Sequence, residues 1–164
     1  MTDRVAIRRL PTGVPGLDQI LGGGLPEFSF NVIAGAPGAG KTTLAQQIMF
    51  ALAGPDRSAL YLTVVGEPPL KMLRYQQQFT FFDIARVNES VRYVNLSQEL
   101  VSGTFEKLLG RIVQEVEATS PRVVIVDSFR TVAQAAERAQ NGNLNLQHFV
   151  QQLAVRLTGW EATT

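Results

Sequence analysis

The sequence predicts an α/β domain with a mostly parallel β-sheet that is covered by helices on both faces. Apolar segments with strand character alternate along the chain with segments whose apolar residues have helical spacing. Strands that are apolar at nearly every position are typical of a parallel sheet with both faces buried. The length of 164 residues and an apolar content of 45% fit one domain with its own core.

The expected elements are marked by their apolar spacing and by turn residues. Gly54-Pro55 ends the first helix, Pro69 begins the second, Ser120-Pro121 ends the third and Gly159 ends the last. Strands are expected over residues 29–34, 59–65, 91–96 and 122–126, and helices over residues 42–53, 70–78, 105–119 and 144–157.

The last five residues, Trp160 to Thr164, follow a helix at the point where the alternation calls for another strand. We therefore expect one partial domain over residues 1–164, truncated at its C-terminal end. Within it, residues 1–27 are a leader segment and residues 28–164 form the core.

Composition excludes several classes of protein. The chain has no cysteine, so it holds no disulfide and no thiolate metal site. No apolar run approaches the ~20 residues of a membrane span, and Met1–Arg4 lacks the features of a signal peptide, so a cytoplasmic location is expected. The net charge of +1 disfavours a broad surface for nucleic acid.

A glycine-rich run provides the strongest functional signal. It fits G-x-x-x-x-G-K-[ST], the phosphate-binding P-loop, and lies between an expected strand and an expected helix. Glycines allow several backbone N–H groups to face a phosphate, and the helix N-terminus adds its dipole. Lys41 is expected to reach the β- and γ-phosphates, where it assists catalysis, and the Thr42 hydroxyl to hold Mg²⁺. The expected nucleotide-binding residues are Gly35, Ala36, Pro37, Gly38, Ala39, Gly40, Lys41, Thr42 and Thr43.

Two acids follow expected strands. Asp127 comes directly after four β-branched residues, Val123 to Val126, and the carboxyl edge of a parallel sheet is where ligands bind. Asp127 is therefore predicted to hold Mg²⁺ opposite Thr42. Glu67 follows the strand over residues 59–65 and is the candidate general base, although an acid in the first turn of a helix is an alternative interpretation.

The base of the nucleotide is predicted to be adenine. The guanine-reading N-K-x-D motif is absent, because none of the three lysines follows an asparagine. ATP is therefore expected over GTP, with Mg²⁺ as the accompanying ion.

The residues Thr12 to Pro26 ahead of the P-loop resemble the opening of RecA/RadA-type ATPases, and of their KaiC-like branch in particular. The stretch Tyr61 to Leu73 is also similar to that branch, so the resemblance covers the chain from about Leu10 onward. It implies a RecA-like P-loop NTPase core that assembles into hexameric rings with ATP between subunits. It also implies Lys41 and Thr42 on phosphate and Mg²⁺.

The same resemblance implies that Asp127 lies on the metal side and that a glutamate after the second strand is the base. Clock members of the family carry two adjacent glutamates there, whereas Gly66 precedes Glu67 here, so two alignments of Glu67 stay open. The family's trans-acting basic finger is expected downstream of this chain. So is the strand that inserts between the P-loop strand and the strand of Asp127.

Three functions are compatible with these motifs. The first is ATP binding and Mg²⁺-dependent hydrolysis, expected to be weak in this chain alone without the basic finger. The second is a nucleotide-dependent assembly switch or signalling scaffold with little hydrolysis, which Gly66 keeps open. The third is a recombinase-like DNA motor, which the loop over residues 131–143 disfavours because it holds one arginine and no aromatic ring.

Overall fold

The centre of the protein is a parallel β-sheet of three strands. In this computed structural model, which describes residues 6–64, 69–102, 105–128, 131, 146–159 and 161–164, the strand order is β4-β3-β5. The strands are β3 (Ala59–Thr63), β4 (Val91–Asn95) and β5 (Val123–Asp127), paired in parallel on both sides of β3. The predicted parallel α/β class is therefore confirmed.

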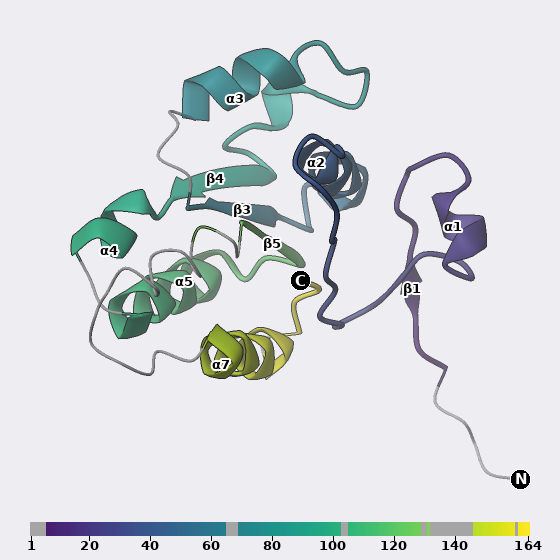
Figure 1. The fold of residues 1–164 in the computed structure, drawn as a ribbon. Helices are drawn as coiled ribbons and strands as arrows, with labels where there is room; N and C mark the ends of the chain where they lie inside the picture. The colour runs from purple at the N-terminus through teal and green to yellow at the C-terminus, as the bar shows by residue number, and fades with distance from the viewer. Residues whose placement is uncertain (1–5, 65–68, 103–104, 129–130, 132–145, 160) are drawn as a thin grey trace, which may run out of the picture.

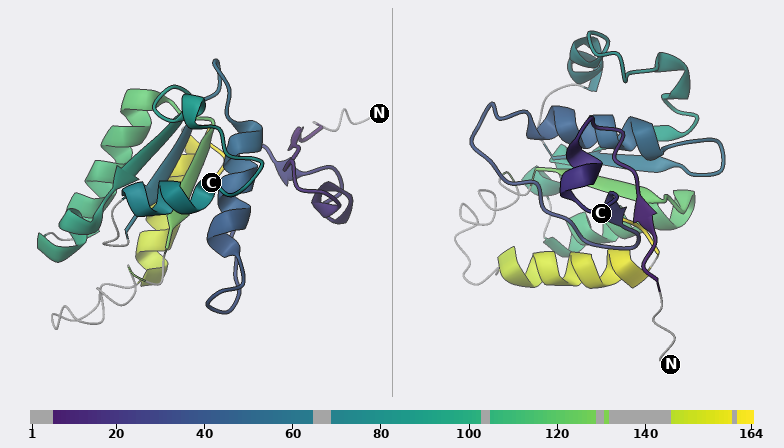
Figure 2. Two further views of the ribbon diagram at one scale, coloured as in Figure 1. Left: turned by 90° about the horizontal axis from the view of Figure 1, so that it is seen from above. Right: turned by 90° about the vertical axis from the view of Figure 1, so that its right-hand side faces the viewer.

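Helices cover both faces of this sheet, so the core has three layers (Figures 1 and 2). On one side lie α2 (Lys41–Leu52) and α3 (Pro69–Gln76), and on the other lie α5 (Phe105–Thr119) and α7 (Leu146–Gly159). The shorter elements are η1 (Ile84–Arg86) and α4 (Ser97–Ser102). None of the described helices is long and apolar enough to cross a membrane.

The alternation of β3 divides the core in two. Successive strand residues point to opposite faces, so Leu60 and Leu62 face α5 and α7 while Ala59 and Tyr61 face α2. The first face carries the aliphatic cluster: Leu60, Leu62, Val64, Leu96, Leu108, Leu109, Ile112, Val116, Val124, Leu153, Leu157 and Ala162. The second carries the aromatic cluster: Met49, Phe50, Ala53, Ala59, Tyr61, Val91 and Val123, with Phe81, Phe82 and Tyr93 packed against it.

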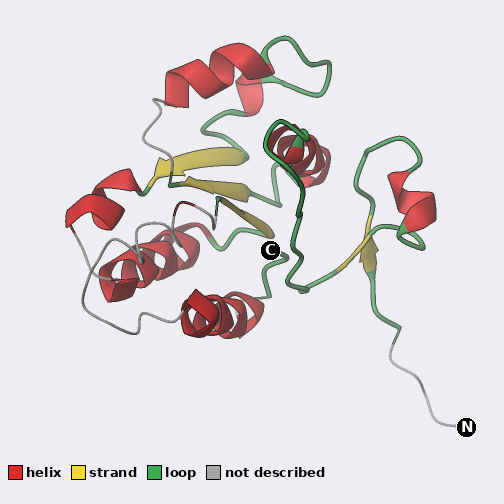
Figure 3. Ribbon diagram, in the orientation of Figure 1, coloured by secondary structure: helices red, strands yellow, loops and turns green. Residues whose placement is uncertain are grey.

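Most predicted elements agree with the structure within one or two residues at the ends that are described. The exception is the strand expected over residues 29–34, which the structure assigns to no strand or helix (Figure 3). A strand needs a continuous ladder of backbone hydrogen bonds to a neighbour, and the backbone bonds described here join Ser29 and Asn31 to the single residue Thr164. Val32 and Ile33 remain 72% and 42% exposed. This prediction was therefore wrong.

The last residues of the chain lie between the 29–31 segment and β5. Thr163 makes backbone hydrogen bonds to β5 and to the residue before it: Val124 N donates to Thr163 O at 2.9 Å, and Thr163 N donates to Arg122 O at 2.9 Å. On the other side Thr164 N donates to Ser29 O at 2.9 Å, and Asn31 N donates to Thr164 O at 2.7 Å. Residues 162–164 thus lie between the segment that precedes the P-loop and β5, which is the position expected for the inserted strand.

The leader forms a small unit beside α2 (Figure 1). Its two short strands, β1 (Arg9–Leu10) and β2 (Leu25–Pro26), pair in antiparallel fashion around α1 (Leu17–Ile20). Gln47 of α2 donates a hydrogen bond to Gly13 O at 3.3 Å. Glu27 forms an ion pair with Arg122, the residue before β5, which joins the leader to the sheet.

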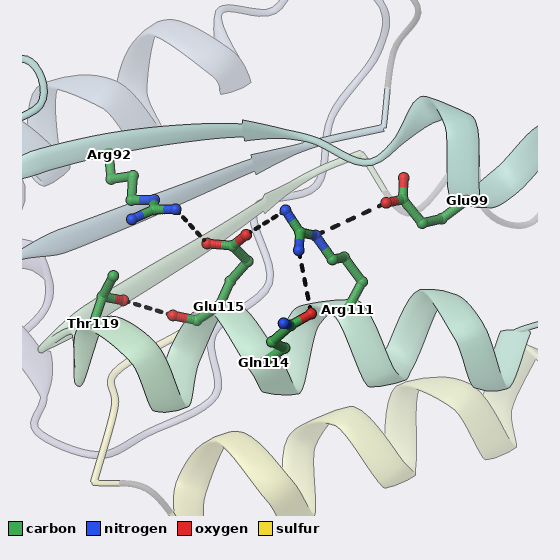
Figure 4. Close-up of polar contacts among 6 residues, drawn as sticks. All are labelled: Arg92, Glu99, Arg111, Gln114, Glu115 and Thr119. Carbon is green, nitrogen blue, oxygen red and sulfur yellow. Dashed lines mark hydrogen bonds and ion pairs between the residues drawn. The ribbon is translucent and has the colours of Figure 1, made fainter.

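A cluster of ion pairs ties α5 to β4 and α4 (Figure 4). Glu115 is 3% exposed and forms ion pairs with two arginines, Arg92 at 3.0 Å and Arg111 at 2.6 Å. Arg111 also lies 3.9 Å from Glu99 of α4. The cluster lies at the β4 edge of the sheet, away from the P-loop.

Candidate nucleotide-binding site

The P-loop segment, residues 35–40, leads directly into the N-terminus of α2. Gly38 and Gly40 have φ angles of +79° and +81°, a region that residues with a Cβ rarely adopt. Gly40 is the N-cap of α2 and makes no side-chain cap, so the first N–H groups of this helix have no side-chain acceptor there. No acidic residue lies in the first turn to repel an anion. The segment is solvent-exposed, as a ligand-binding loop must be.

Lys41 folds back over this loop. Its Nζ donates hydrogen bonds to the backbone oxygens of Gly35 at 2.9 Å and Ala36 at 2.8 Å. Inside the loop, Ala39 N donates to Ala36 O at 3.2 Å. The ammonium group therefore lies against the loop that the sequence motif predicts for phosphate. Pro37 is exposed in the same turn, and Thr43 is half-buried in the first turn of α2.

Thr42 and Asp127 meet across the gap between α2 and β5. The hydroxyl of Thr42 donates to Asp127 Oδ2 at 2.7 Å. Asp127 is the last residue of β5 and pairs in register with Thr63, the last residue of β3. Its position in the alternation places it on the α2 face, because it lies two and four residues after Ile125 and Val123 of the aromatic cluster. The two residues predicted to hold Mg²⁺ thus lie together.

A third side chain, Tyr61, reaches the same carboxylate. Its hydroxyl donates to Asp127 Oδ2 at 2.6 Å, and its ring is fully buried on β3. Burial, followed by the charge of Asp127 and the hydrogen bond to it, raises the pKa of Tyr61 well above its usual value, so the phenol stays protonated. This residue was not predicted from the sequence. The sequence did contain one signal for it: Tyr61 is the only aromatic residue of the apolar strand β3 and carries a hydroxyl among aliphatic neighbours.

Other predicted residues fall outside the described part of the chain. These are Glu67, the candidate base, and nearly all of the loop over residues 131–143 that was weighed for DNA binding. Within the described residues, no group of three or more histidines, cysteines, aspartates and glutamates could hold a metal ion.

Comparison with known proteins identifies the family of this chain. The family model described as "ATPase: KaiC" matches residues 10–164. The DNA repair protein RadA of Mycobacterium tuberculosis is 31% identical over 126 residues, covering 77% of this chain and 23% of RadA. A UPF0273 protein of Methanocaldococcus jannaschii is 31% identical over 87 residues, covering 53% of this chain and 36% of that protein. The chain thus spans about a quarter to a third of the length of these relatives.

A solved structure has the same fold. The KaiC-like protein of Pyrococcus horikoshii superposes with a TM-score of 0.78 at 22% identity, over 97% of this chain and 70% of that one. This likeness supports the RecA-like α/β architecture, and the match of the family model to nearly the whole chain supplies the assignment. The chain belongs to the KaiC ATPase family.

Proposed function

We propose that this chain binds ATP with Mg²⁺ and hydrolyses it as one unit of a ring-forming ATPase. The observation that carries the proposal is the contact between Thr42 and Asp127 at the end of the P-loop. It brings the two expected Mg²⁺ residues together from positions 85 apart in the chain. Such an arrangement is what a phosphate-bound metal needs.

The residues present fit a polyphosphate. The loop has two glycines with positive φ, an uncapped helix N-terminus behind it and no acid in the first turn. The ammonium group of Lys41 is held by two backbone oxygens of an exposed loop, so it can exchange them for phosphate oxygens at little cost. These groups would bind the phosphates and orient the γ-phosphate for attack.

The residues also fit Mg²⁺, which prefers oxygen ligands and few protein groups. A threonine hydroxyl can bind the ion through a lone pair and still donate its proton to a carboxylate. Thr42 would take this role, with Asp127 as the acceptor that fixes its orientation. When bound, Mg²⁺ neutralises charge on the β- and γ-phosphates.

Hydrolysis and assembly are the finer parts of the proposal. Glu67 is proposed as the base that orients and deprotonates the attacking water. A basic residue from a neighbouring subunit would stabilise the charge of the transition state, an effect of about 10³–10⁵ in rate. ATP would therefore lie between subunits of a homo-oligomer, proposed as a hexamer.

A thermal-shift titration with Mg·ATP and Mg·GTP tests the binding step. At 100 times its Kd, a ligand adds about 2.7 kcal/mol to the stability of the folded state. We expect a shift of several degrees with ATP, a smaller one with GTP, and none in Lys41→Ala. Lys107→Ala, an exposed lysine on α5, is the matched control. A shift that survives Lys41→Ala would contradict the proposed site.

Phosphate release separates an ATPase from a switch. In the ring-forming protein, Glu67→Gln should keep ATP binding and slow turnover at least 100-fold, the typical contribution of a general base. Glu117→Gln, on the exposed side of α5, should leave turnover unchanged. Equal turnover of Glu67→Gln and wild type would remove Glu67 from the mechanism. No turnover in the wild-type ring would favour the assembly switch.

A second candidate function rests on the relative RadA, whose name describes a DNA repair protein. A DNA motor of this type would bind single-stranded DNA in an ATP- and salt-dependent manner. Fluorescence anisotropy of a labelled oligonucleotide with Mg·ATP tests this. Binding that weakens as salt rises would favour the motor, and unchanged anisotropy would exclude it.

A further inference from the structure

The carboxylate of Asp127 accepts two hydroxyl donors on the same oxygen. Thr42 donates to Oδ2 at 2.7 Å from α2, and Tyr61 donates to Oδ2 at 2.6 Å from β3. The first donor belongs to the P-loop motif. The second comes from the middle of the core and has no part in that motif.

The register of the sheet explains how Tyr61 reaches this point. Tyr61 pairs with Ile125, and Asp127 lies two residues further along β5 on the same face. A tyrosine ring is long enough to span that offset, whereas an aliphatic side chain at the same position would end among Met49 and Phe50. The hydroxyl therefore reaches Asp127 at the carboxyl edge of the sheet.

The contact is a strong one. A hydrogen bond to an ionised carboxylate is shorter and about twice as strong as a neutral one. Its donor is fully buried, so water does not compete for it. Because two donors converge on one oxygen, the orientation of the carboxylate is fixed from both sides.

Tyr93, on the adjacent strand β4, offers a comparison with Tyr61. It pairs in register with Tyr61 on the adjacent strand, and the two rings lie 5.3 Å apart between centroids. Its hydroxyl oxygen is buried and has no hydrogen-bond partner among the described residues. Tyr93 thus contributes its ring to the aromatic cluster, while Tyr61 contributes a ring and a directed donor.

We propose that Tyr61 is a positioning residue that holds Asp127 Oδ2 toward Thr42, so that the pair is preorganised for Mg²⁺. The inference rests on the proposed Mg·ATP function and extends it to a residue outside the motifs. Partners behind a metal-binding group typically contribute about 10- to 100-fold to metal affinity. Tyr61 acts through Asp127 and touches neither the nucleotide nor the metal.

The experiment compares Tyr61→Phe with Tyr93→Phe, each of which removes one buried hydroxyl and keeps the ring. Binding of a fluorescent ATP analogue to the whole chain is titrated with Mg²⁺, starting in EDTA. We expect the Mg²⁺ concentration at half-effect to rise about 10-fold in Tyr61→Phe, with metal-free binding unchanged. Tyr93→Phe should match wild type. Circular dichroism of both variants confirms that they are folded.

A double-mutant cycle separates positioning from general loosening of the site. If Tyr61 acts through the carboxylate, Tyr61→Phe should have no further effect on the Mg²⁺ requirement in an Asp127→Asn background. An additive effect there would overturn the inference, and so would equal Mg²⁺ requirements in Tyr61→Phe and wild type. Wild-type protein that binds the analogue equally with and without Mg²⁺ would overturn the proposed metal role as well.

Discussion

The two faces of the central sheet are built from different kinds of residue. The aliphatic cluster against α5 and α7 contains only Leu, Ile, Val and Ala. The face against α2 carries the aromatic cluster, and its alternation ends at Asp127 beside Thr42. The same three strands supply both faces, because successive side chains of each strand point to opposite sides of the sheet.

This difference separates stability from positioning. Aliphatic packing is non-directional, so it stabilises the sheet without fixing any one atom. Hydrogen bonds depend on distance and angle, and the donors on the α2 face converge on one carboxylate oxygen. We therefore expect substitutions on the first face to change the free energy of unfolding, and substitutions on the second to change ligand binding.

The largest effect should follow truncation inside the aliphatic cluster. Ile112→Ala removes a fully buried side chain of α5 and should lower the free energy of unfolding by about 2–5 kcal/mol, because a cavity remains. Urea denaturation measures this. Ile84→Ala, at a 59% exposed isoleucine, should cost far less. Equal losses in the two variants would contradict the assigned core.

A smaller loss is expected at the ion-pair cluster on the same side of the sheet. Glu115→Ala leaves Arg92 and Arg111 without their shared carboxylate and should cost about 1–3 kcal/mol, since both arginines can regain water. Glu117→Ala on the exposed side of α5 is the control. If both variants melt at the wild-type temperature, the cluster does not stabilise the fold.

Beyond β5, the segment before the P-loop should affect both ligand binding and stability. The Asn31 amide donates to Ser29 Oγ at 2.9 Å and to Thr164 O at 3.0 Å, which holds this segment against the chain end. Asn31→Ala should cost about 1 kcal/mol of unfolding free energy and weaken ATP binding several-fold. Val32→Ala, at a 72% exposed position, should change neither. Calorimetry with Mg·ATP would measure the affinity of both.

The smallest effect is expected in the leader, beyond α2. The N–H and hydroxyl of Thr12 donate to Asp18 Oδ1 at 2.8 and 2.6 Å, and they hold the pKa of Asp18 below its usual value of 3.8. This contribution to stability is present above about pH 3.8 and is lost as the pH falls through the lowered pKa.

Thr12→Val should raise the pKa of Asp18 part of the way back, because the backbone donor remains. Thr12→Ser keeps the hydroxyl and should preserve the lowered value. An NMR titration of the Asp18 carboxyl carbon from pH 2 to 6 would check both, and an identical pKa in wild type and Thr12→Val would contradict the assigned contact.

The sequence predicted the structure well where the relevant pattern lies within a few neighbouring residues. The P-loop motif and the apolar run before Asp127 predicted that Thr42 and Asp127 would meet, and the structure brings their oxygens to 2.7 Å. It was a poor guide to the segment over residues 29–34, because a strand exists only through its neighbours. The role of Tyr61 could not be predicted for the same reason, since it depends on the register between β3 and β5.

The sequence by itself determined the α/β class, the order of the helices and strands after the P-loop, and the position of the glycine-rich loop before α2. These follow from periodicity, turn residues and glycines, which act within a few residues of one another. Only the tertiary structure decided which residues share a face, that the last three residues lie beside β5, and that Tyr61 supports Asp127. Such facts depend on pairing between strands distant in the chain, and no local pattern encodes that pairing.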